Sequence, residues 1–339
     1  MFKREELLAF LKNGTPMRGV PAGFWMHFPV TAQHGGAAID AHMQYYGETG
    51  VPLVKIMNEH PYRLAERIET PEDWRKVRPL KLEDTDYPAF LDEIRMLRAR
   101  MGEDALILAT IHGVLVSACH ATDGMGKFPD LNNTITRHLK ENPEATAVGL
   151  NAIADTLKRL SAACIEAGAD GIYYAALGAE EERFSEALYT TYVKPLECDL
   201  LGSLMERGAV FLHICKDHPR LPMFQGYPCH VVNWAEHSSS YTLEDGAALF
   251  GVVGGAVEKE RVDSERRGHL VPHDGAELLS GGPFGHTGDQ PGKGDRLIAR
   301  PGARPPGRNR LRDPLLHDVA VDQFRFGTGR CFEQTGPVA

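Results

Sequence analysis

The stretch TAVGLNAIADTLKRLSAACIEAGADGIYYAAL (146–177) joins a long helical pattern to a short apolar run. Apolar residues over 146–167 recur at spacings of three and four, which is typical of an amphipathic helix. Gly168 marks the expected helix end, because glycine readily adopts the left-handed backbone that often follows a helix. The run GADGIYYAAL (168–177) has the length and composition of a buried parallel strand. The stretch therefore predicts a helix that leads directly into a strand of a parallel sheet.

The same alternation recurs over the first 260 residues. Seven short apolar runs are candidate strands: PAGFWMHF (21–28), VPLVKIMN (51–58), DALILATIHG (104–113), GADGIYYAAL (168–177), GAVFLHIC (208–215), CHVVNWA (229–235) and ALFGVVGG (248–255). Helical patterns are expected between them, over 35–47, from a cap at Thr70-Pro71, and over 87–101, 146–167 and 181–207. The last of these helices is expected to break or kink at Pro195, because proline lacks a backbone N–H.

Repeated βα units predict an α/β fold, specifically a (β/α)₈ TIM barrel. An eighth strand is expected after residue 256, where DRLIARPG (295–302) is a poor strand sequence. The last strand and helix of the barrel are therefore expected to be degraded. A doubly wound open sheet is the alternative, because the pattern alone does not prove that the sheet closes.

Composition limits the classes of protein that this chain can belong to. It has 339 residues, of which 42% are hydrophobic and 24% charged, as in ordinary globular proteins. The sequence lacks an uninterrupted apolar run of about 18 residues and a signal-peptide core, so we expect a cytoplasmic protein without a membrane span. Six scattered cysteines indicate reduced thiols, some of which could bind metal. The net charge of −9 argues against a nucleic-acid partner.

A change in amino-acid composition predicts two parts, a barrel over 1–258 and an atypical tail over 259–339. Residues 261–339 contain 11 Arg but only one Lys, together with 13 Gly and 8 Pro. Such a segment has too few large apolar groups to offset the entropy lost on ordering. One interpretation is a natural disordered tail. The other is a shift of reading frame near residue 258, because GC-rich coding sequence read out of frame yields this composition.

Chemistry in a barrel is expected where the strands end. The ends of the first four candidate strands carry polar side chains, from which we predict five catalytic residues: His27, Asn58, Glu59, His112 and Tyr173. Each has a structural alternative. A histidine can be hydrogen-bonded within the core, a glutamate can be solvated in a loop, and a tyrosine can serve only to pack.

The fifth candidate strand ends in His213-Ile214-Cys215. Side chains two apart on a strand point to the same face, so we expect the imidazole and the thiol to share the barrel mouth. Nitrogen and sulfur donors suit Zn²⁺, which predicts His213 and Cys215 as metal ligands. A third ligand is still required, and Cys229, His237, Glu59 or a residue beyond 256 are the candidates. The alternative is a buried histidine beside a structural cysteine.

Taken in order, several of these motifs resemble the uroporphyrinogen decarboxylase family over roughly residues 15–257. The resemblance is carried by PAGFWMHF, VPLVKIMNE, EAGADGIYYAAL, FLHIC and LFGVVGG. It implies a (β/α)₈ barrel and a tetrapyrrole- or corrinoid-linked substrate, since the family includes decarboxylases and cobalamin-linked methyltransferases.

Within the family, the residues favour the methyltransferase branch. The decarboxylase branch has an arginine-containing loop after the first strand, but here MHFPVTAQHGG (26–36) has no arginine. An aspartate of that branch is matched by Asn58, which cannot supply its negative charge. His213 and Cys215 match two zinc ligands of the methyltransferase branch, whose third ligand would lie beyond residue 257.

The resemblance therefore implies zinc-assisted methyl transfer from a methylcorrinoid to a thiol, with a small molecule or a corrinoid protein as substrate. The first alternative is a cofactor-free uroporphyrinogen decarboxylase of porphyrin biosynthesis. The second is a non-catalytic barrel or an inactive product.

Overall fold

Parallel strands lie side by side in the order in which they occur along the chain. We describe a computed structural model, which covers residues 2–15, 17, 21–23, 25–216, 218–235 and 239–250, together with the backbone of 257–261 and 320–324. The main sheet has the order β1 (Leu53–Ile56), β2 (Leu106–His112), β3 (Gly171–Ala176), β4 (Ala209–Ile214) and β5 (Val231–Trp234). All four pairings are parallel. A parallel bridge from Gly23 to Leu53 adds the first predicted strand at the β1 edge.

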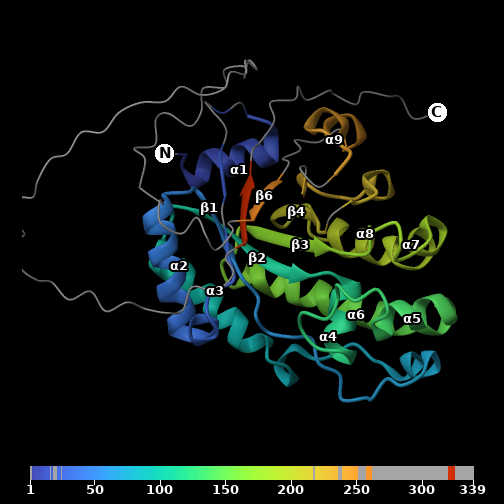
Figure 1. Cartoon of the computed structure of the whole chain (residues 1–339). Coiled ribbons are helices and arrows are strands. Elements are labelled where there is room, and N and C mark those ends of the chain that lie inside the picture. Colours follow the sequence, from blue (N-terminus) through green and yellow to red (C-terminus); the bar gives the residue numbers. More distant parts are fainter. Residues whose placement is uncertain are drawn as a thin grey trace, which may run out of the picture. The chain divides into compact units, whose positions relative to one another are not determined.

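Helices connect successive strands and cover the outside of the curled sheet (Figure 1). The α-helices before β3 are α1 (Arg4–Asn13), α2 (Gly35–Thr49), α3 (Tyr87–Met101), α4 (Val114–Thr122), α5 (Thr134–Glu141) and α6 (Pro143–Glu166). Those after β3 are α7 (Glu186–Tyr192), α8 (Lys194–Gly202) and α9 (Leu243–Phe250). Four short 3₁₀ turns are η1 (Val30–Ala32), η2 (Pro71–Lys76), η3 (Leu82–Asp84) and η4 (Leu221–Phe224). The predicted α/β fold of the barrel type is confirmed.

Each face of the main sheet packs in its own apolar cluster. The outer cluster lies between the strands and the helices, and includes Ile172 and Leu212 from the strands and Trp74 from η2. The inner cluster contains the alternate strand residues, such as Tyr173 and Phe211. Leu7 of α1 belongs to the inner cluster, which places α1 on the opposite side of the sheet from α3 and α6 (Figure 1). Both faces are thus buried, as expected for strands of a barrel.

The predicted helices are confirmed with small shifts of their ends. α3 spans the predicted residues, α2 and α6 are slightly longer than predicted, and the cap at Thr70 begins η2. The helix predicted over 181–207 with a break or kink at Pro195 is two shorter helices, α7 and α8, and Pro195 lies in the first turn of α8, just after the break. Proline is tolerated there because first-turn N–H groups have no partner within the helix.

The seventh predicted strand, ALFGVVGG (248–255), is wrong over its described residues. Residues 248–250 end helix α9, and 251–256 lie outside the described residues. The reason is a reciprocal cap at the helix start, in which the Thr242 N–H donates to Asp245 Oδ2 at 2.8 Å. The Asp245 N–H donates in turn to Thr242 Oγ1 at 3.2 Å. This capping box starts a helix that carries the apolar run into helical conformation.

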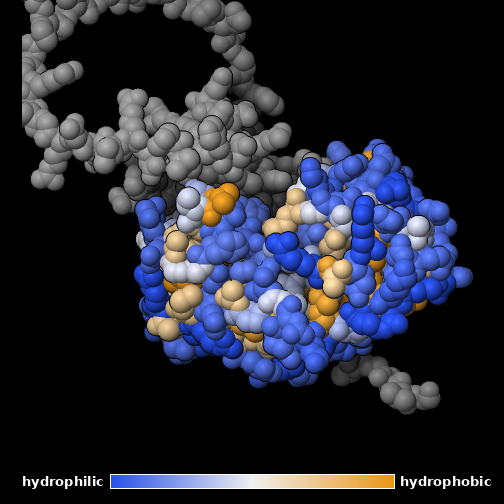
Figure 2. Space-filling view, turned by 90° about the horizontal axis from the view of Figure 1, so that it is seen from below, coloured by the Kyte–Doolittle hydropathy of each residue, from blue (hydrophilic) through white to orange (hydrophobic). Residues whose placement is uncertain are grey.

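Only short pieces of the predicted tail are described. β6 (Val257–Arg261) pairs antiparallel with β7 (Ala320–Phe324). The candidate eighth strand, 295–302, lies outside the described residues, so its assignment and the boundary at 258–259 stay predictions. The face of the molecule in Figure 2 is largely hydrophilic, with apolar residues in separate patches. In the part of the chain that is described, no helix combines the length and apolar character needed to cross a bilayer.

A buried carboxylate joins β3 to α7, α8 and the loop before β5. Glu197 of α8 is fully buried and accepts hydrogen bonds from the hydroxyls of Tyr174, Tyr189 and Tyr227, at 2.8–2.9 Å. Burial raises the pKa of Glu197 above its ordinary value of 4.5, and the three hydroxyls only partly offset that rise.

Replacing Gly149 with Ala should destabilise the protein. A Cβ at Gly149 of α6 would lie 2.5 Å from Cε3 of buried Trp74, so we expect overpacking to cost about 1–3 kcal/mol. Gly47→Ala in α2 is the matched control, because a Cβ there meets no atom within 4 Å. It should stabilise the helix by up to about 1 kcal/mol. Urea unfolding of both variants tests this, and equal effects would contradict the packing argument.

Glu197→Gln should change how stability depends on pH. Because the folded-state pKa of Glu197 is raised, its contribution to stability is complete below pH 4.5 and is lost as the pH rises through the folded-state pKa. The unfolding free energy of the wild type should therefore fall relative to that of the variant above pH 4.5. Urea unfolding from pH 4 to pH 8 measures the difference, and parallel curves for the two proteins would refute it.

Candidate functional site

The register of the sheet aligns one row of residues at the carboxyl ends of four strands. His112 pairs with Ala175, Ala175 with His213, and His213 with Asn233. Tyr173 and Phe211 point into the barrel as members of the inner cluster. The four residues of this row lie at the same alternate strand positions, so they belong to the same inner face. The predicted site residues His112 and His213 are therefore brought to one level of the barrel mouth, two strands apart.

Asn233 of β5 holds His213 and Tyr173 together. Its Oδ1 accepts hydrogen bonds from His213 Nδ1 at 2.7 Å and from the Tyr173 hydroxyl at 3.2 Å. The rings of Tyr173 and His213 are stacked with centroids 5.1 Å apart. Because a carbonyl oxygen can only accept, Nδ1 of His213 is the donor of this hydrogen bond, and Nε2 takes no part in it. Nδ2 of Asn233 is buried without a hydrogen-bond partner among the described residues.

A lysine inside the barrel was not among the predicted site residues. Lys55 of β1 is buried, and its Nζ lies 4.4 Å from the ring centroid of Tyr173 and 4.9 Å from that of Trp25. Trp25 and Tyr173 also meet edge to face at 4.9 Å. Such cation–π contacts stabilise an ammonium away from water. The available signal was a charged residue in the middle of the apolar run VPLVKIMN.

His27 and Glu59 form a pair at the rim. Nδ1 of His27 lies 2.7 Å from Oε1 of Glu59, whose side chain is buried while that of His27 is 59% exposed. Burial tends to raise the pKa of Glu59, but the His27 hydrogen bond and the nearby positive charge, to which Lys55 contributes, outweigh it, so this pKa is lowered. Glu59 is therefore an ionised carboxylate at neutral pH. Because its side chain is buried, it is not the solvated loop residue that was the alternative interpretation.

Asn58 and His112 are joined through the backbone. Nε2 of His112 donates to the carbonyl oxygen of Asn58 at 2.8 Å, while the Asn58 side chain accepts from the His60 N–H. Burial lowers the pKa of His112 and lowers that of neighbouring His120 to about 3. Both imidazoles are therefore neutral at physiological pH. The Asn58 amide shapes the loop.

The predicted sulfur ligand lies just beyond β4. The Cys215 N–H donates to the Ala176 carbonyl at 3.0 Å, which continues the strand ladder, and the side chain packs against the outer cluster. Of the candidate third ligands, Cys229 is buried with its pKa raised to about 12 by burial, and its thiol donates to the Tyr227 carbonyl. Glu59 is paired with His27. His237 lies outside the described residues, as do 251–256, 262–319 and 325–339, and only the backbone of 257–261 and 320–324 is described.

Comparison with known proteins decides the family. The model of the family described as "Uroporphyrinogen decarboxylase (URO-D)" matches residues 49–255, more than half of the chain. The chain belongs to the uroporphyrinogen decarboxylase family. Among solved structures, a methyltransferase from Methanosarcina mazei is similar in fold, with a TM-score of 0.56 and 17% sequence identity. The match covers 75% of this chain and 82% of that chain. No curated protein matches this sequence.

Two cavities of this protein lie beside the carboxyl ends of its strands. One, of about 670 Å³, is lined by residues of the loops after β3 and β4, including Glu180, Lys216 and Arg220. The other, of about 600 Å³, is lined by residues that include Glu59, His34 and His60. Ligand sites of barrels are expected at this end.

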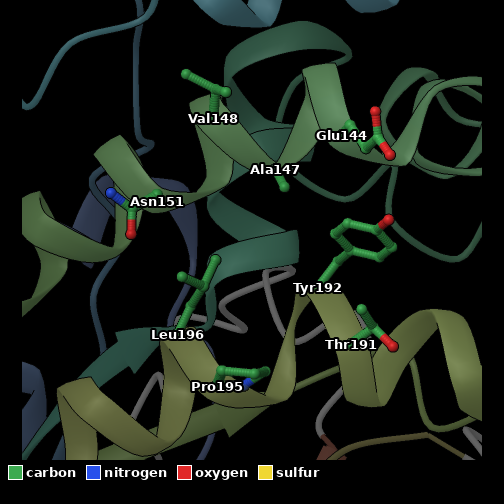
Figure 3. A pocket seen from close by; sticks show the side chains of 8 residues that line it. All are labelled: Glu144, Ala147, Val148, Asn151, Thr191, Tyr192, Pro195 and Leu196. Carbon is green, nitrogen blue, oxygen red and sulfur yellow. The ribbon is translucent and has the colours of Figure 1, made fainter.

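A third hollow, of about 410 Å³, lies on the outer helices between α6 and the α7–α8 pair (Figure 3). Its lining is mainly apolar, with Val148, Pro195 and Leu196, and Glu144 is its one ionisable carboxylate. Its lining also includes Asn151, Thr191 and Tyr192, and it contains none of the predicted site residues.

Asn233→Leu should destabilise the barrel by about 1–3 kcal/mol, because it removes the Oδ1 that accepts hydrogen bonds from the Tyr173 hydroxyl and from His213 Nδ1–H. Tyr173→Phe removes only one donor and should cost about 0.5–1.5 kcal/mol. In the double variant the loss of unfolding free energy should be smaller than the sum of the two single losses, because the two residues are in contact. Urea unfolding of the three variants measures the coupling, and strict additivity would show that the hydrogen bond carries no energy.

Proposed function

We propose that this protein transfers a methyl group from a methylcorrinoid to a thiol with the help of Zn²⁺. The observation that carries this proposal is the hydrogen bond from His213 Nδ1 to Asn233 Oδ1. A hydrogen bond at one ring nitrogen orients the ring so that the other nitrogen can bind a metal, as is usual for metal-bound histidines. His213 is thus held with Nε2 available to a metal.

The donor set fits zinc in kind. His213 supplies an imidazole nitrogen and Cys215, two residues on, supplies a sulfur. The Cys215 side chain would have to leave its contacts with the outer cluster to reach the metal. We place the third ligand after residue 256, where most of the chain lies outside the described residues, because Glu59 already pairs with His27 and the Cys229 thiol is directed to the Tyr227 carbonyl. When bound, zinc would lower the pKa of the acceptor thiol and hold the resulting thiolate.

His27 and Glu59 are assigned to proton transfer. Glu59 orients the imidazole through Nδ1, while Nε2 of exposed His27 takes the proton of the acceptor thiol. The thiolate sulfur then forms a bond to the methyl carbon. The carbon–cobalt bond breaks, and its electron pair remains on the corrinoid as Co(I). Protons and electrons therefore balance without a further reductant.

Lys55, Trp25 and Tyr173 form the wall of the barrel mouth. We assign to them the exclusion of water and the binding of a negatively charged substrate group by Lys55. The unpartnered Nδ2 of Asn233 supplies a further donor to substrate. The corrinoid is a substrate-side partner, free or carried by a protein, and we place the reaction in the cytoplasm.

Lys55 also supports a second candidate, cofactor-free decarboxylation of a porphyrinogen. A buried ammonium is a suitable counter-ion for a substrate carboxylate. Against it stand Asn58 in place of an aspartate and the absence of arginine from residues 26–36. Turnover of uroporphyrinogen by zinc-free protein would favour this reaction.

Cys215→Ala should remove one zinc ion per chain and abolish methyl transfer. Cys198→Ala is the matched control, because Cys198 is also half-buried but lies on α8. Metal content by mass spectrometry and conversion of methylcobalamin to cob(I)alamin in the presence of a small alkanethiol are the measurements. Unchanged zinc in Cys215→Ala would contradict the proposed site, and absence of both metal and turnover in the wild type would indicate a non-catalytic barrel.

A further inference from the structure

A second group of metal-ligating side chains lies apart from His213 and Cys215. His34, His60 and Glu93 each offer one ligand atom, and these three atoms all lie within 4.8 Å of one another. Among the described residues, these are the three metal-ligating side chains whose donor atoms lie this close together. Its members come from different elements: His34 precedes α2, His60 follows β1, and Glu93 lies on α3.

The carboxylate at the centre of the group is buried. The side chain of Glu93 is 3% exposed, and its Oε2 lies 3.1 Å from Nε2 of His60. Its Oε1 accepts the backbone N–H of Gly35 at 2.7 Å and lies 4.0 Å from Nδ1 of His34. A buried carboxylate charge is costly unless cations or strong donors surround it. A metal ion between Glu93 and the two imidazoles would neutralise this charge directly.

The two histidines are already adjacent. Their rings meet with centroids 4.7 Å apart at 62°. His60 is buried, and its backbone N–H donates to Asn58 Oδ1 at 3.0 Å, which fixes the loop that carries it. His34 is half-exposed at the start of α2, so a small rotation brings its Nδ1 closer. Ligand atoms about 2.0–2.1 Å from a tetrahedral ion lie roughly 3.4 Å apart. The imidazole of His60 lies 3.1 Å from the Glu93 carboxylate and that of His34 lies 4.0 Å from it, so His34 is the ligand that must move on metal binding.

We propose that His34, His60 and Glu93 bind a divalent transition-metal ion of the zinc class. Two imidazoles and one carboxylate are the donor set of zinc sites that keep an open coordination position. The open position would face the cavity of about 600 Å³, which His34, His60 and Glu59 all line. A water molecule or a small oxygen ligand would occupy it. This inference does not rest on the proposed methyl transfer.

The decisive measurement is metal content of the full chain after removal of metal and reconstitution with Zn²⁺. A His213→Ala/Cys215→Ala variant should retain one zinc ion per chain. Adding His34→Ala to this variant should weaken zinc binding at least about 100-fold. Loss of a residue that only hydrogen-bonds to a ligand typically weakens binding by roughly 10–100-fold, so the larger effect identifies a ligand. In the otherwise unmodified chain, His34→Ala should lower the zinc content by one equivalent. His27→Ala is the matched control, because His27 is also an exposed rim histidine but is bonded to Glu59.

Reconstitution with Co²⁺ separates the two sites by their ligands. The His34 site should give visible cobalt bands without a thiolate charge-transfer band, and Glu93→Gln should weaken them while circular dichroism confirms a folded chain. If zinc content and cobalt bands are the same in folded His34→Ala and Glu93→Gln as in the parent, the proposal is wrong. It is also wrong if the His213→Ala/Cys215→Ala variant binds no metal. Loss of metal on Cys215→Ala alone bears only on the methyl-transfer site.

Discussion

The parallel register from β2 to β5 is the constraint on which the rest of this protein depends. It places His112, Ala175, His213 and Asn233 in one row and directs that row into the barrel. A slip of one residue in β4 would exchange His213 with Ile214, which now packs in the outer cluster. Apolar burial on both faces holds the register, so the stability of the barrel and the placement of its polar site have the same origin.

Much of the fold could be predicted because each element carries a local signal. The apolar runs at 104–113 and 168–177 are long enough to identify strands, and α6 shows a clear helical period. The run at 248–255 failed because composition alone does not distinguish a buried strand from a helical end. Thr242 and Asp245, three residues apart, were the signal that decided the matter, and they lie outside the apolar run itself.

The site was only partly predictable for a different reason. Strand parity correctly brings His112, Tyr173 and His213 to the inner face, and the chain order of strand ends brings His27 near Glu59. Glu93 could not be found in this way, because it lies on a helix and meets His60 only through tertiary packing. The role of Asn233 depends on a hydrogen bond across neighbouring strands, which no spacing along the sequence reveals.

The packing of Trp25 gives this barrel an internal optical reporter. Its indole lies against the ammonium of Lys55 inside the mouth, whereas Trp74 and Trp234 are sealed in the outer layer with no exposed surface. An anion that attracts the Lys55 charge changes the electric field at one indole and leaves the other two unaffected. Intrinsic fluorescence can therefore report occupancy of the mouth without an attached dye.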